Sequence, residues 1–224
     1  ITGQAYKRNK NGDLLIGTTS GLPQTESDWS VLGDRNPKLT GGLTTNLSYK
    51  GFRLSAMVSG MFGASVVNGT MRAMMDRGQS WESVRLRESR HYVFPGVLMD
   101  GMEDTDTPTK NTVAVDMWKY AGTSVFTGGD EDWFEEDVHF LRLSEVRLSY
   151  NVPSSWLKRA TKNFVSSASI WAKATDLVTL TNYSGIDAVG NSNSAALGGA
   201  GGMGIDVWGT PNPRGYSFGV NLTF

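Results

Sequence analysis

The sequence predicts an all-β protein, specifically a segment of a transmembrane antiparallel β-barrel with long outer loops. Two stretches support this: the last ten residues and the stretch from Lys38 to Gly63, in both of which large apolar residues alternate with small or polar ones. The third observation is that no apolar run approaches the roughly 18 to 20 residues of a membrane-spanning helix. Any membrane residence would therefore be through strands.

The C-terminal strand has one apolar face. Its residues are large and apolar at every second position: Tyr216, Phe218, Val220, Leu222 and Phe224. The residues between them are small or polar, as expected for a face that looks into water. A chain that ends on an aromatic after such a strand resembles the closing strand of a bacterial outer-membrane barrel. We therefore expect this face to be the signal that the assembly machinery reads.

The stretch from Lys38 to Gly63 predicts a β-hairpin with a two-residue turn at Lys50-Gly51. In that register Tyr49 lies opposite Phe52, and Leu43 opposite Val58. Every pair on this face is apolar, small or Thr, and the other face is largely polar. A slip of one residue would scramble both faces, so the register is well specified.

Alternation predicts spanning strands near residues 38–50, 52–63, 138–151, 164–177 and 214–224, and outer loops at 1–37, 64–137 and 178–213. Leu141 and Leu143 fall out of phase with Val146, so we expect a β-bulge near Ser144. The turns at 50–51 and 152–163 are short, and barrels of this kind place short turns in the periplasm and long loops outside. The C-terminus is accordingly predicted to be periplasmic. Five strands cannot close a barrel, so this chain needs further strands.

Composition excludes several functional classes. The 224 residues carry a formal net charge of −1, which does not fit a generally basic nucleic-acid binder. The absence of cysteine removes disulfides and thiolate metal sites. The two histidines, His91 and His139, form no metal-ligand spacing, and we predict that the protein is not an enzyme. The chain opens on Ile1 without a signal peptide, so we expect a processed product or part of a longer polypeptide.

Several motifs, in order along the chain, resemble the SusC/RagA family of TonB-dependent transporters. The first is a hairpin with the pattern GDxNPK, GG and YKGFxL, followed by FxED, FLRL and LSYxxP and then by LTxYSGxD. In this sequence these motifs lie within Leu32–Gly42, Leu47–Leu54, Phe134–Leu143, Leu148–Pro153 and Leu177–Asp187, and the stretch Pro211–Phe224 completes the resemblance. Two departures occur: Asp176 stands where the family usually has Asn, and Ala188-Val189 replaces Pro-Glu.

The resemblance implies the C-terminal part of such a transporter, within a barrel of about 22 strands. It implies residence in the outer membrane of a Bacteroidetes-type Gram-negative bacterium and uptake of oligosaccharides or peptides. The implied partners are the remaining strands and plug of the same transporter, a SusD-like surface lipoprotein, outer-membrane lipid and, through the absent N-terminal part, the TonB complex.

The long loop after the hairpin is strongly acidic. From Asp100 to Asp137 there are eleven acidic residues against two lysines, a local net charge of −9. A solvated loop is the first interpretation. The alternative is a calcium site, because carboxylate oxygens suit hard cations, and its candidate ligands are Asp104, Asp106, Asp130 and Asp132. No other cofactor is predicted.

The loops also hold candidate contacts for ligands and partners. Met71 to Arg90 has a helix-like composition interrupted by Gly78, which predicts a packed loop helix or a contact face for the capping lipoprotein. Trp118, Tyr120, Trp133 and Trp208 could stack on sugar rings or pack the loops themselves.

A second class stays open from the sequence alone: a soluble, secreted β-sandwich that binds glycans. A sandwich buries its apolar face against a second sheet, whereas a barrel leaves that face to lipid.

Overall fold

The computed structural model describes residues 1–162, 164–188 and 204–224. The chain divides into two compact units, each built from three stretches. Unit 1 comprises residues 1–36, 65–136 and 189–209, and unit 2 comprises 37–64, 137–188 and 210–224. No helix in the part of the chain that the structure describes is long and apolar enough to cross a membrane.

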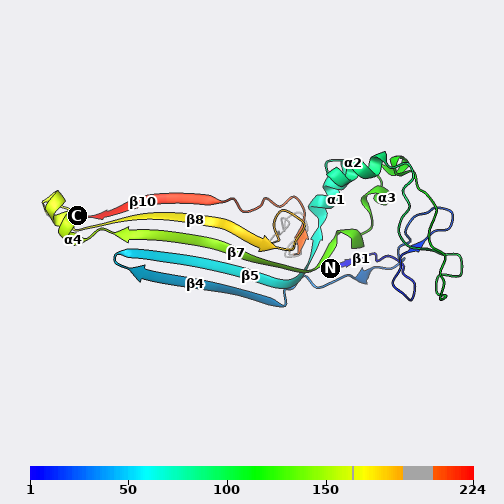
Figure 1. The fold of residues 1–224 in the computed structure, drawn as a ribbon, viewed down its shortest axis with the longest axis horizontal. Coiled ribbons are helices and arrows are strands. Elements are labelled where there is room, and N and C mark those ends of the chain that lie inside the picture. The colour runs from blue at the N-terminus through cyan, green and yellow to red at the C-terminus, as the bar shows by residue number, and fades with distance from the viewer. Residues whose placement is uncertain (163, 189–203) are drawn as a thin grey trace. The chain divides into compact units, whose positions relative to one another are not determined.

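Unit 2 is a sheet of long strands that lie side by side in the order β10, β8, β7, β5, β4 (Figure 1). The strands are β4 (Leu39–Tyr49), β5 (Phe52–Asn68), β7 (Phe134–Asn151), β8 (Ser167–Thr181) and β10 (Gly215–Thr223). The pairs β4/β5, β7/β8 and β8/β10 are antiparallel. The sheet is not closed on itself: within the described residues, β4 and β10 are its two edges.

The predicted hairpin register is confirmed. Tyr49 pairs with Phe52, Leu43 with Val58 and Leu39 with Phe62. Lys50 and Gly51 both have positive φ, 45° and 88°, as a two-residue hairpin turn of type I′ requires. Gly51 suits this turn because it carries no side chain to resist positive φ.

The strand ends differ from the expected ones in two places. β5 continues to Asn68 instead of stopping near residue 63, because its end pairs with the short strand β9 (Ile205–Asp206) in unit 1. β8 covers 167–181 instead of 164–177, because Val178 and Leu180 continue its alternation and pair with Leu143 and Leu141. The predicted loops at 64–137 and 178–213 are shortened accordingly.

The β-bulge lies near Ser144, where the alternation of apolar residues along β7 changes phase. The register of β7 with β8 shifts between Leu143 and Glu145. Before the shift Leu141 and Leu143 lie on the apolar face, and after it Val146, Leu148 and Tyr150 do, so one face stays apolar along the strand. The predicted short turn after β7 contains the helix α4 (Ser154–Thr161).

The apolar face of the sheet is exposed. Phe218 is 88 % exposed and Leu43 is 69 % exposed, and neither is covered by a second sheet in the described part of the chain. Aromatic residues lie at both ends of this face, with Phe52 against Tyr150 at one end and Phe62 stacked on His139 at the other. The exposed face argues against the β-sandwich alternative.

Unit 1 combines short helices and strands. Its strands are β1 (Thr2–Gly3) paired with β3 (Ser30–Val31), and β2 (Leu15–Ile16) paired with β6 (Val97–Leu98). Its helices are α1 (Gly69–Asp76), α2 (Trp81–Glu88) and α3 (Ser124–Thr127), with 3-10 turns at η1 (Met117–Tyr120) and η2 (Glu131–Trp133). The break between α1 and α2 falls at Gly78, as predicted, where φ is +69°.

The core of unit 1 is small and contains methionine and phenylalanine. Met75, Val115, Met117 and Phe126 are each 4 % exposed or less. The partly buried side chains packed against them are Leu22, Leu86, Tyr92, Phe94, Tyr120 and Trp133. Gly33 of the GDxNPK motif has a packing role in the same unit, since a Cβ there would lie 2.2 Å from the Phe134 ring.

Candidate functional site

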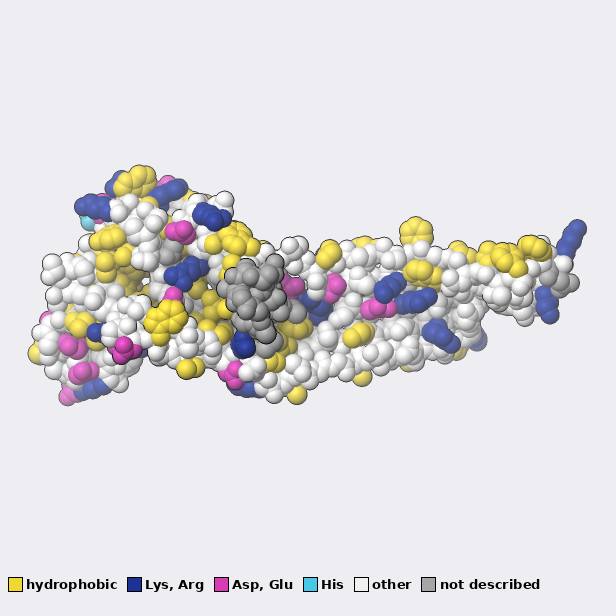
Figure 2. All heavy atoms as spheres, turned by 180° about the vertical axis from the view of Figure 1, so that it is seen from behind, with side chains coloured by type: hydrophobic (Ala, Val, Ile, Leu, Met, Phe, Trp, Pro, Cys, Tyr) yellow, Lys and Arg dark blue, Asp and Glu magenta, His cyan; other side chains and the backbone are white. Residues whose placement is uncertain are grey.

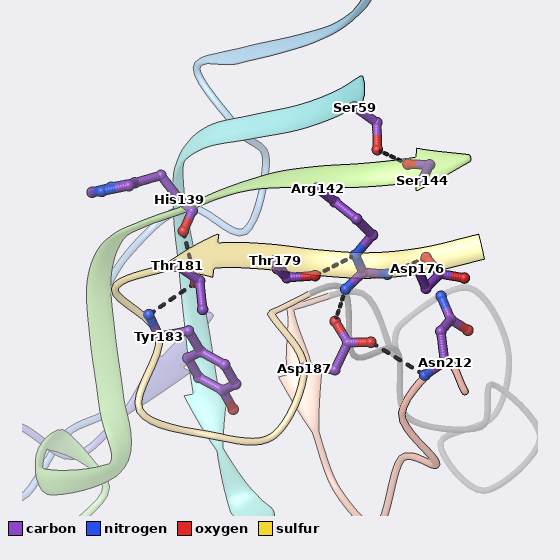
Figure 3. Close-up of polar contacts among 10 residues, drawn as sticks. All are labelled: Ser59, His139, Arg142, Ser144, Asp176, Thr179, Thr181, Tyr183, Asp187 and Asn212. Carbon is purple, nitrogen blue, oxygen red and sulfur yellow. Dashed lines mark hydrogen bonds and ion pairs between the residues drawn. The ribbon is translucent and has the colours of Figure 1, made fainter. Parts of the chain in front are cut away.

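The polar face of the sheet carries a buried arginine on β7. Arg142 is 6 % exposed, and alternation places it opposite the apolar Leu141 and Leu143. Its Nε donates to Thr179 Oγ1 at 3.0 Å, and its Nη2 donates to Asp187 Oδ1 at 2.5 Å (Figure 3). Asp176 Oδ1 lies 3.8 Å from Nη1, so the guanidinium lies between two carboxylates.

Asp187 connects this arginine to the segment before β10. Its second carboxylate oxygen accepts a hydrogen bond from the backbone N–H of Asn212 at 3.5 Å. The stretch after β8 is held in the same region: Tyr183 N–H donates to Thr181 Oγ1, and Thr181 Oγ1 donates to His139 O. The FLRL and LTxYSGxD motifs, separated in sequence, therefore meet in one hydrogen-bonded network.

Further charged side chains lie on the same face of β7 and β8. Lys173 Nζ is 2.7 Å from Glu145 Oε2, and the Arg147 guanidinium lies 4.8 Å from the centre of the Trp171 ring. Basic and acidic side chains are seen next to each other over the strands in Figure 2. One face of the sheet is therefore suited to water and the other to an apolar medium.

Unit 1 contains a pocket of about 600 Å³. Its wall includes Tyr92, Phe94, Phe126 and Trp133, and the core residues Met75 and Met117 form part of its floor. The charged side chains that line it are Arg72, Glu82, Asp130 and Asp132. A mostly apolar wall with a few polar groups is typical of small-ligand sites of this size.

The acidic run at η2 anchors the start of the chain. Asp130 Oδ2 accepts from Gln4 N–H, and Glu131 Oε2 accepts from Tyr6 N–H at 2.8 Å. The Tyr6 hydroxyl donates to Asp132. Burial, together with the hydrogen bond and charge of Asp132, holds the pKa of Tyr6 above its usual range, so the phenol keeps the proton that it donates.

The predicted calcium ligands are distributed over two places. Asp130 bonds Arg72, and Asp132 bonds Tyr6. Asp104 accepts a hydrogen bond from the backbone N–H of Lys10. Asp106 forms an ion pair with the Nζ of the same lysine. Across residues 1–162, 164–188 and 204–224, no group of three or more His, Cys, Asp or Glu side chains is placed to hold a metal ion. The calcium site stays a prediction, and the structure gives these carboxylates protein partners.

The four predicted aromatic contacts have different surroundings. Trp118 and Trp208 are about half exposed and lie beneath guanidinium groups, those of Arg90 at 4.9 Å and Arg77 at 4.8 Å. Tyr120 packs against the core of unit 1. Trp133 also packs there and, of the four, is the one that lines the pocket.

Known proteins resemble this chain along its whole length. It is 28 % identical over 224 residues to TonB-dependent receptor P26 of Formosa agariphila, and 22 % identical over 222 residues to TonB-dependent receptor P3 of the same organism. The chain is similar to TonB-dependent receptors. It spans 20 % of the length of the P26 receptor and 19 % of the P3 receptor. No family model matches the sequence.

Solved structures also resemble this chain. The RagAB peptide importer covers all of the chain, with 21 % identity and a TM-score of 0.56 in its open-open state and 0.57 in its closed-closed state. The chain spans 22 % and 23 % of those importer chains. The resemblance to SusC/RagA-type TonB-dependent transporters that the motifs indicated is confirmed. The relatives are named as receptors and an importer, which fits the prediction of a non-enzyme.

Proposed function

We propose that this chain forms part of the barrel wall and outer loops of a TonB-dependent transporter in the outer membrane of a Gram-negative bacterium. The observation that carries the proposal is the two-faced sheet, apolar and exposed on one side and charged on the other, in a chain related over its full length to TonB-dependent receptors. Lipid would cover the apolar face, and the polar face would line the lumen.

The two edge strands of the sheet, β4 and β10, indicate that further strands are needed to close a barrel. In hydrocarbon an unpaired N–H or C=O costs several kcal/mol, so β4 and β10 must each pair with strands outside this sequence. The rest of the barrel is the partner that this requires, and the plug of the same transporter is implied by the resemblance to SusC/RagA transporters. Closure at about 22 strands is the size that such transporters have.

The transported substrate belongs to the class of oligosaccharides or peptides, and a SusD-like lipoprotein caps the barrel. This part of the proposal rests on the resemblance to SusC/RagA transporters, and a solved relative is named as a peptide importer. Energy would come from the TonB complex. The helical stretch 69–88 and the aromatic residues of unit 1 are the proposed surfaces for the lipoprotein and the substrate.

The proposed orientation places the long connections outside the cell and Phe224 on the periplasmic side. An epitope tag inserted between Gly101 and Met102, in an exposed stretch, should be reached by antibody on intact cells. The same tag between Lys50 and Gly51 should be reached only after the outer membrane is opened. Equal accessibility at both sites on intact cells would contradict the orientation.

Transport itself is tested by deleting the gene and following uptake of labelled peptide and oligosaccharide mixtures. Loss of uptake of one mixture, restored by the intact gene, supports the proposal and names the substrate class. Unchanged uptake of both mixtures would contradict it.

A further inference from the structure

The pocket of unit 1 has an unbalanced charge. Three of its four charged side chains have an oppositely charged partner within the unit: Arg72 and Asp130 pair with each other at 2.9 Å, and Glu82 pairs with Arg85. Asp132 does not have such a partner among the described residues. The pocket therefore holds one carboxylate whose charge no cation of the described chain offsets.

Neutral groups hold that carboxylate in place. The Tyr6 hydroxyl donates to Asp132 Oδ2, and so does Gly129 N–H at 2.8 Å. Gly129 N–H also lies 2.8 Å from the Tyr6 hydroxyl oxygen, so the three groups form a closed set. These donors orient the carboxylate without cancelling its charge.

Aromatic rings surround the same space. Tyr6, Tyr92, Phe94 and Trp133 all line the pocket, and Tyr92 meets Phe94 edge to face with the ring centroids 4.8 Å apart. The faces of aromatic rings attract cations, with tryptophan the strongest, and the attraction increases when water is excluded. A carboxylate gives a cation a charge-assisted hydrogen bond, which is stronger than a neutral one.

We propose that this pocket binds an organic cation, namely an ammonium or guanidinium group on an apolar stem, such as the side chain of lysine or arginine in a peptide. The cation would meet Asp132 and the rings of Tyr92 and Trp133, and its stem would lie along Met75 and Phe94. The inference deepens the proposed function by naming a substrate class, and it rests on that function only for the step from binding to uptake.

The pocket itself favours a peptide cation over a neutral sugar. Apolar side chains such as Leu14, Leu22 and Met117 make up much of its wall. A sugar would leave hydroxyl groups against these side chains without hydrogen-bond partners, which costs free energy. The methylene stem of lysine or arginine needs no such partners.

The test uses two probes of the same shape and different charge. N-acetyl-argininamide and N-acetyl-citrullinamide are titrated by calorimetry into the intact, detergent-purified receptor that contains this chain. We expect the arginine compound to bind about tenfold more tightly or better, because a hydrogen bond to a charged group contributes enough free energy for a change of at least this size. Equal affinity of the two probes, or no binding of either, would overturn the proposal.

Substitutions locate the binding to the pocket. Asp132→Asn keeps an acceptor for Tyr6 and Gly129 but removes the charge, and it should reduce the arginine affinity to that of citrulline. The matched control is Asp28→Asn, an exposed carboxylate outside the pocket, which should leave both affinities unchanged. If Asp132→Asn left the preference for arginine intact, the cation would bind elsewhere and the proposal would be wrong.

Two further outcomes separate this inference from the proposed function. Tighter binding of a neutral oligosaccharide such as maltotetraose, lost in Trp133→Ala, would identify a glycan site and overturn the cation site while leaving transport intact. Binding of N-acetyl-argininamide that depends on Asp132, in a receptor whose deletion changes no uptake, would support the pocket and contradict the transport proposal.

Discussion

Arg142 on β7 and Asp187 lie 45 residues apart in the chain and form a charge-assisted hydrogen bond of 2.5 Å in which both side chains are largely buried. Asp187 in turn accepts from the backbone of Asn212. One guanidinium group thus fixes the conformation of two stretches of chain that follow β8 and precede β10.

Replacing Arg142 with Ala should destabilise the folded protein by about 3 kcal/mol or more, because it removes the buried cation that Asp187 and Asp176 share. The measurement is the free energy of urea unfolding of the detergent-refolded receptor. The control is Lys38→Ala, which removes the exposed pair with Asp137 and should cost about 1 kcal/mol or less. Similar losses in the two variants would show that the Arg142 network adds no more than a surface ion pair.

Asp176 should be needed for its backbone conformation as well as its charge. It has φ of +50°, a left-handed conformation that Asp and Asn adopt more readily than other residues with side chains. Asp176→Asn, the residue usual in the family, should therefore fold with near-normal stability, whereas Asp176→Ala should lose about 1 kcal/mol. Thermal unfolding of both variants gives the answer. A larger loss in the Asn variant would mean that the charge beside Arg142 dominates.

The apolar face of the hairpin should contact lipid. Leu43→Lys, at a proposed midplane position, should cost about 2 to 4 kcal/mol and reduce the amount of assembled receptor in the outer membrane. Thr44→Lys, one residue later on the polar face, should cost much less. Quantitative blotting of outer-membrane fractions compares the two, and equal defects would count against the assignment of the faces.

The C-terminal residue should matter for assembly. The Phe224 ring packs 5.2 Å from that of Phe164, and β10 pairs with β8 as far as Thr223 and Ser167. Deleting Phe224 should lower the amount of assembled receptor while synthesis stays unchanged, as judged by pulse labelling and membrane fractionation. Phe164→Ala separates the two roles of the ring: if it reproduces the full defect, packing and not a terminal signal is responsible.

The sheet could be predicted from the sequence because its determinants are local. Alternation over Leu39 to Phe62, with a glycine at the turn, permits one register, and the break of phase at Ser144 identifies the bulge. The end of β5 differs from the expected one because it depends on pairing with β9, which the residues of β5 do not indicate. The end of β8 differs because its pairing continues beyond the bulge, to Leu143 and Leu141.

The networks could not be predicted, because they join residues that are distant in sequence. The pocket draws on residues 4–25, 72–95 and 117–133, and no local pattern links these stretches. One signal was present for Arg142: a charge inside the apolar run Phe140 to Leu143 needs a buried partner. The carboxylates at 130–132 could bind either calcium or protein donors, and the sequence alone does not say which. In the structure, donors from Gln4, Tyr6 and Arg8 bind Asp130 and Glu131.

The division of the chain has a consequence for how such receptors can diversify. Unit 1 is built from three stretches of sequence that segments of unit 2 separate, and its core and pocket come from the first two, residues 1–36 and 65–136. A single crossover in the hairpin between these two stretches would combine part of the core and pocket of one parent with part of those of the other. The ligand preference of the proposed pocket is therefore expected to change through point substitution, or through exchange of both stretches at once, while the barrel strands vary independently.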